Sequence, residues 1–128
     1  MKRLTLTLGL LVLAVVSVAC SSASGANTTP SSGTVDPNAP VVVAQNNAFS
    51  PATVTIKSGK AVSLTLENKD AAPHNVAIYK DSSASEKVSI GEIISSSSAT
   101  QEVPALEKGQ YFFRCDVHHD MTGTIVVD

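Results

Sequence analysis

Apolar and polar residues alternate with a period of two along most of the chain after residue 40. In TVTIKSGKAVSLTLEN, residues 53–68, the apolar side chains of Val62, Leu64 and Leu66 face one way and polar neighbours face the other. This alternation is typical of strands with one buried face. Because Ser-Gly-Lys at 58–60 separates two such runs, we expect a hairpin with a glycine turn.

Further short runs of the same kind predict an all-β domain. They are PVVVAQ (40–45), HNVAIY (74–79), ATQEVPAL (99–106), GQYFFRC (109–115) and TGTIVVD (122–128). No helical stripe is longer than about a turn, so we expect an antiparallel sandwich or barrel. Residues 81–99, with Val88, Ile90, Ile93 and Ile94, predict either a strand or a single helical turn within a serine-rich loop.

The first 40 residues differ from this pattern. Residues 1–19 have two cations and then an apolar run, as a signal peptide does. The ending VSVAC resembles the lipobox of bacterial lipoproteins, which implies lipidation at Cys20; an ordinary secreted start and an uncleaved anchor are the alternatives. Residues 20–40, rich in Ser, Thr, Ala, Gly and Pro, predict a flexible tether. We expect an exported lipoprotein, membrane-anchored and facing the periplasm or the cell exterior.

The remaining head, residues 41–128, forms one small domain of mild charge. Seven Lys and Arg stand against ten Asp and Glu, a net of −3. Without a basic patch or a charge run, we expect no nucleic-acid partner. Cys115 is the only cysteine of the chain besides Cys20, so a disulfide within the mature protein is not expected. Cys115 is therefore either a buried inert thiol or a metal ligand.

The run RCDVHHDMTG, residues 114–123, concentrates metal-ligating side chains on one loop between two strands. Cys115, His118 and Met121 follow Cys-x-x-His-x-x-Met spacing, and His74 begins another strand 41 residues earlier. Alone, His74 would more often be structural and Met121 core filler. Together, a thiolate, two imidazoles and a thioether are the ligand set of a blue-copper electron-transfer site. Structural zinc sites prefer four strong ligands.

These residues carry a resemblance to a known family. PHNV (73–76) and YFFRCDVHHDMTGTIVV (111–127) resemble the cupredoxins, and among them the amicyanin and plastocyanin group. The flanking FSPATVTIKSGKAVSLTLEN (49–68) is similar to the strands before the first ligand histidine of that family. The resemblance implies a Greek-key β-sandwich of about seven to eight strands over residues 41–128. It also implies one copper ion that alternates between Cu(I) and Cu(II).

Residue by residue, the resemblance implies that His74, Cys115 and His118 are the strong ligands and Met121 the long axial one. Asn75 matches an asparagine that ties the two ligand loops together. We expect His119 to be exposed and not to bind the metal. Asp116, His119 and Asp120 make the rim of the site polar where the family is more apolar, and we expect this rim to face a partner.

We therefore expect a tethered one-electron carrier, not an enzyme, that works with redox protein partners as a monomer. A copper-binding lipoprotein for storage or delivery is the alternative, although the chain lacks Met-rich or His-rich clusters. A copper enzyme would need a second copper site, and no histidine is left to build one. A dinuclear copper centre would need a second cysteine on the loop. A metal-free adhesive lipoprotein is the structural alternative.

Overall fold

The structure is a computed structural model that describes residues 39–128. The signal peptide expected at 1–19, the lipidation expected at Cys20 and nearly all of the tether expected at 20–40 lie outside these residues. Within the described part of the chain, no helix is long and apolar enough to cross a membrane.

Every regular element of residues 39–128 is a β-strand. The nine strands are β1 (Val41–Gln45), β2 (Ala48–Ser50), β3 (Thr53–Ile56), β4 (Val62–Asn68), β5 (Ala77–Tyr79), β6 (Lys87–Ile90), β7 (Ser98–Val103), β8 (Gly109–Arg114) and β9 (Thr122–Val127). The predicted all-β class is confirmed, with β2 as a short strand that the alternation did not indicate. Residues 81–99 contain a strand, β6, and no helical turn.

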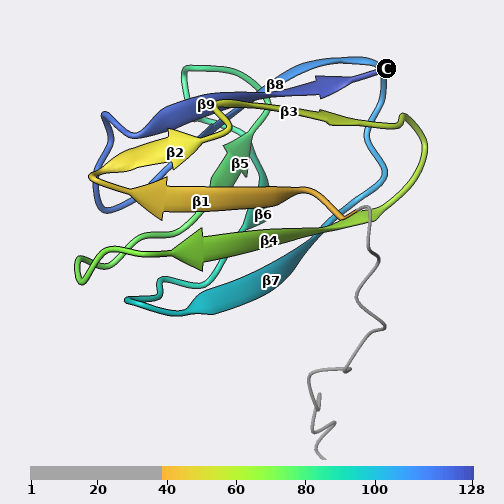
Figure 1. Cartoon of the computed structure of the whole chain (residues 1–128). Coiled ribbons are helices and arrows are strands. Elements are labelled where there is room, and N and C mark those ends of the chain that lie inside the picture. The colour runs from red at the N-terminus through yellow and green to blue at the C-terminus, as the bar shows by residue number, and fades with distance from the viewer. Residues whose placement is uncertain (1–38) are drawn as a thin grey trace, which may run out of the picture. The chain divides into compact units, whose positions relative to one another are not determined.

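The strands form two sheets that face one another across the core (Figure 1). One sheet has the order β2-β1-β4-β7, and the other has the order β3-β9-β8-β5-β6. The predicted sandwich is confirmed, but the expectation that it is antiparallel is wrong for two strand pairs. β1 runs parallel to β4, and β3 runs parallel to β9. Period-two alternation reports a buried face, which parallel and antiparallel strands present alike.

The hairpin predicted for residues 53–68 is wrong. β3 pairs with β9 in one sheet, whereas β4 pairs with β1 and β7 in the other. The segment between them crosses from one sheet to the other and turns at Gly59, whose φ of 71° lies in the left-handed region that favours glycine. The glycine turn between these two alternating runs therefore belongs to a connection between the two sheets and not to a hairpin.

The inward faces of both sheets form a single core that extends to the loop of Cys115. Its buried members are Val42, Ala44, Phe49, Val54, Ile56, Leu64, Leu66, Val76, Ile78, Val103, Leu106, Phe113, Cys115, Met121, Ile125 and Val127. The rings of Phe49 and Phe113 lie 5.3 Å apart between centroids. Gly123 on β9 leaves room for Phe113, because a Cβ there would overlap the phenyl ring and lie 2.7 Å from the carbonyl oxygen of Ala52. The packing around Phe113 thus supports β8, which ends directly before Cys115.

Candidate metal centre

The loop between β8 and β9 brings Cys115, His118 and Met121 together. The Cys115 N–H donates to the Met121 carbonyl and the Met121 N–H donates to the His118 carbonyl, each at 3.0 Å. These bonds close the loop so that all three side chains start from one tight turn. Cys115 is fully buried and Met121 is 2% exposed, while His118 is partly exposed.

His74 reaches the same end of the sandwich from a different part of the chain. It precedes β5 and forms two backbone hydrogen bonds of 2.9 Å with Ile94, which fix its position. The side chain of Asn68, 4% exposed, donates to the carbonyls of Ala72 and Ile94 at 2.8 and 2.7 Å, and so binds both segments beside His74. His74 is fully buried.

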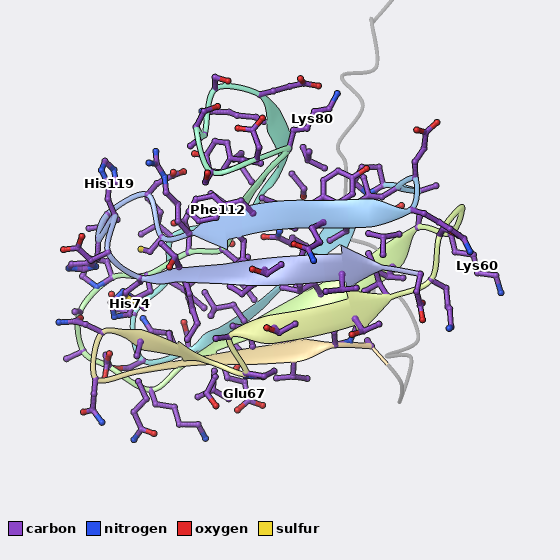
Figure 2. The ribbon with its side chains drawn as sticks, turned by 90° about the horizontal axis from the view of Figure 1, so that it is seen from above. Lys60, Glu67, His74, Lys80, Phe112 and His119 are labelled. Atoms are coloured by element: carbon purple, nitrogen blue, oxygen red, sulfur yellow. The ribbon has the colours of Figure 1, made fainter. Side chains whose placement is uncertain are left out.

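The ligand atoms of His74, Cys115 and His118 converge. The Cys115 Sγ lies 3.8 Å from His74 Nδ1 and 3.9 Å from His118 Nδ1, and the two Nδ1 atoms are 3.1 Å apart. All three atoms lie within 4.8 Å of one another. Figure 2 shows His74 inside one end of the sandwich, His119 projecting outward there and Lys60 at the opposite end.

The donor set fits a copper ion. The His74 Nε2 lies 3.1 Å from the Asp70 carboxylate, which can only accept, so Nε2 is the donor of this bond. The other ring nitrogen of His74, Nδ1, faces the sulfur of Cys115 and the Nδ1 of His118. Nitrogen and thiolate donors with a neighbouring thioether suit copper, whose preference for such soft ligands exceeds that of Mg²⁺ or Ca²⁺.

Asp70 is a supporting residue that sequence reasoning missed. Its carboxylate accepts the backbone N–H groups of Asn46 and Asn47 at 2.9 and 3.0 Å, besides the His74 ring. Both asparagines have positive φ, 54° and 55°, in the turn between β1 and β2. These two N–H donors, followed by the smaller effect of His74, lower the pKa of Asp70. Its spacing of four residues from His74 was the only indication in the sequence.

We predict that Asp70→Ala weakens copper binding by about 10- to 100-fold, the usual cost of removing a residue that orients a metal ligand. The His74 ring would lose the acceptor that fixes its proton on Nε2. Competition with a chelator for Cu(II) measures the change. Asp81→Ala is the matched control, because Asp81 accepts the Ser83 N–H at 2.8 Å in an exposed turn. Equal affinities of the Asp70 and Asp81 variants would contradict the prediction.

Asn75 links the two ligand loops. It is 1% exposed, and its Oδ1 accepts the backbone N–H of Asp116 at 2.8 Å. Its Nδ2 donates to the Gly91 carbonyl at 3.3 Å and to the Asp116 carboxylate at 3.4 Å. Because Asn75 follows His74 and Asp116 follows Cys115, these bonds hold the two ligands in register.

The three rim residues lie differently from one another. His119 and Asp120 are exposed, and the His119 ring bonds the Asp116 carbonyl at 3.1 Å, away from the ligand cluster. The Asp116 side chain is only 27% exposed and accepts a hydrogen bond from Tyr79. Two apolar side chains, Val117 of this loop and Ile93, are 43% and 54% exposed.

The chain is similar to known proteins over most of its length. The family model described as a cupredoxin-like domain matches residues 9–127. Plastocyanin A/B of Petroselinum crispum is 33% identical over 86 residues, which cover 62% of this chain and 87% of that protein.

Solved structures show the same arrangement of strands. Amicyanin of Paracoccus versutus has a TM-score of 0.57 at 27% identity and covers 73% of this chain and 85% of its own. The Cu(I) form of an amicyanin variant matches at 26% identity and a TM-score of 0.57, over 73% of this chain and 86% of its own. Reduced auracyanin of Roseiflexus castenholzii, at 19% identity, shares the fold with a TM-score of 0.64, over 70% of this chain and 96% of its own.

Proposed function

Because the chain belongs to the cupredoxin-like family, we propose that it is a one-electron carrier with a single type 1 copper site. The observation that carries the proposal is the convergence of Cys115 Sγ and the Nδ1 atoms of His74 and His118 within 4.8 Å. Bound copper would supply one-electron chemistry by alternating between Cu(I) and Cu(II). The chain would supply ligands whose positions do not depend on the oxidation state.

Four residues would hold the ion. His74, Cys115 and His118 would be the strong ligands, because their donor atoms face one another. Met121 would be the fourth and weaker ligand, since its buried side chain starts from the same closed loop. The bonds of Asp70 to His74 and of Asn75 to Asp116 would keep these positions fixed during electron transfer.

Burial of the ligands supports a carrier over a protein for copper storage or delivery. Three of the four ligand residues are at most 2% exposed, so release of the ion would require the loop to open. A carrier keeps its ion through many redox cycles, whereas a delivery protein must release it. Copper that dissociates upon reduction would favour the storage or delivery alternative.

His118 is the proposed point of electron entry and exit. It is the one ligand histidine that is partly exposed, and it follows the exposed apolar side chain of Val117. A redox protein partner that docks here would bring its own redox centre close to the imidazole edge. The exposed His119 and Asp120 would give this contact its polar rim.

We also propose that the head works outside the cytoplasm, attached to a membrane by lipid at Cys20. The support is the sequence of residues 1–20 and the composition of residues 20–40. A tether of this kind would let a monomeric head move between membrane-associated donors and acceptors. Radiolabelled fatty acid that is retained by the wild-type protein but not by Cys20→Ser would test the anchor.

We predict that His118→Gly changes the visible spectrum of the copper protein and slows electron exchange. Loss of a residue that merely supports a ligand lowers metal affinity or activity by about 10- to 100-fold, and loss of the ligand itself should lower them at least as much. Visible absorption measures the spectrum, and stopped-flow mixing with a small redox reagent measures the rate of electron exchange. His119→Ala is the matched control, because this neighbouring histidine is exposed and bonds only a backbone carbonyl. An unchanged spectrum and rate for His118→Gly would remove its proposed role.

A further inference from the structure

Two opposite charges flank the thiol of Cys115. The side chain of Cys115 points into the core, so those of Arg114 and Asp116 leave the strand on the other face of the five-stranded sheet. They are 24% and 27% exposed. The Arg114 Nε lies 3.7 Å from the Asp116 Oδ1. An Arg-Cys-Asp order at the end of β8 thus places one cation and one anion beside a buried sulfur.

Tyr79 on β5 contacts both charged side chains, Arg114 and Asp116. Its ring lies 5.1 Å beneath the guanidinium carbon of Arg114, within the range of a cation–π contact. Its hydroxyl donates a hydrogen bond of 2.6 Å to the Asp116 carboxylate. Tyr79 itself is 1% exposed. We name these three residues the Arg114–Tyr79–Asp116 clasp.

The clasp is connected to both ligand segments. Asp116 follows Cys115 directly and bonds Asn75, which follows His74. Burial and then the bond to Asp116 raise the pKa of Tyr79, so its hydroxyl is a protonated donor at neutral pH. A hydrogen bond to a charged acceptor is stronger than one between neutral groups. Movement of Cys115 relative to His74 would therefore have to break the bonds between Asp116 and Asn75, while the bond from Tyr79 holds Asp116 in place.

We propose that the Arg114–Tyr79–Asp116 clasp positions Cys115 and sets the reduction potential of the bound metal through its two charges. The inference rests on the proposed copper site and goes beyond it, because none of the three residues is a ligand. Oxidation adds one positive charge to the site. A fixed anion nearby favours the oxidised form and a fixed cation favours the reduced form. Such charges act more strongly where solvent is partly excluded.

The two charges give predictions of opposite sign. Asp116→Asn keeps the shape but removes the anion, and should favour the reduced form by about tenfold, a rise of ~59 mV in a one-electron potential. Arg114→Gln should lower the potential. Asp120→Asn is the matched control, since it removes the same charge from an exposed position of the same loop and should have the smaller effect. Voltammetry of the four copper-loaded proteins measures the potentials.

Equal potentials for all variants, or shifts of the same sign for Asp116→Asn and Arg114→Gln, would overturn the role of the clasp charges. The wild-type protein separates this failure from that of the copper site. If it has no reversible one-electron couple, the proposed function itself is wrong. If it has a normal couple that the variants do not move, only the clasp is wrong.

The positioning role has a test that needs no metal. Tyr79→Phe keeps both charges but removes the donor to Asp116, and we expect the melting temperature of the metal-free protein to fall by about 5 °C or more. Tyr111→Phe is the control, because that hydroxyl makes a weak bond of 3.4 Å to the Glu107 carbonyl. If both variants melt at the wild-type temperature, Tyr79 does not hold the clasp.

Discussion

Replacing Cys115 with serine is expected to abolish the intense blue colour of the copper-loaded protein. The colour of such sites comes from charge transfer between a cysteine thiolate and Cu(II), and a serine hydroxyl cannot supply it. Serine is close to cysteine in size, so the fully buried position should still pack. Absorption in the visible range and electron paramagnetic resonance of Cu(II) measure the loss.

The other cysteine of the chain provides the matched control for this substitution. Cys20→Ser makes the same chemical change outside the head, and the blue colour should persist. A blue Cys115→Ser protein would show that the thiol of Cys115 is not a ligand. Loss of colour in Cys20→Ser alone would show that Cys20, and not Cys115, supplies the thiolate.

Phe113→Ala should lower the free energy of unfolding by about 3–5 kcal/mol, the usual cost of removing a buried phenyl ring. Phe113 is fully buried, lies against Phe49 and fills the space left by Gly123. A small domain is stable by only about 5–15 kcal/mol, so this variant should lose much of its stability. Urea denaturation of the metal-free protein measures the change.

The next residue toward the N-terminus is a control for this effect. Phe112 lies on the opposite face of β8 and is only partly buried, so Phe112→Ala should cost clearly less. Because Phe113 packs two residues before Cys115, Phe113→Ala should also weaken copper retention. Equal destabilisation by both substitutions would contradict the inward orientation of Phe113.

The proposed ligand set could be assembled from the sequence because it depends mainly on side-chain types. Cysteine, histidine and methionine at Cys-x-x-His-x-x-Met spacing can meet on one loop whatever the surrounding fold. Including His74 required further information, since its separation in sequence from Cys115 does not show that the two residues lie close together. Its place at the start of a predicted strand, together with the family resemblance, supplied what spacing could not.

The pairing of strands was less predictable than their existence. Alternation identified β3 and β4 but could not show that they belong to different sheets. Only long-range contacts decide that β3 lies beside β9. β3 begins at Thr53 and β9 begins at Thr122, which is 69 residues later. The supporting residues were hidden for the same reason. Asp70 and Tyr79 look like ordinary surface and strand residues until the fold brings them to His74 and Asp116.

The polar rim shows that residue type alone could not predict which side chains are exposed. Asp116, His119 and Asp120 are all polar, but only the last two are exposed. The carboxylate of Asp116 faces Tyr79 and Asn75. Alternation places the side chains on either side of Cys115 away from the core, while the long-range position of β5 determines what they meet there.

The most direct test of the copper site is a titration of the purified metal-free protein with Cu(II), followed by visible absorption. The convergence of His74, Cys115 and His118 predicts an intense blue band that grows linearly and stops at one copper ion per chain. A protein that stays colourless, or a band that continues to grow beyond one equivalent, would contradict a single type 1 site at these residues.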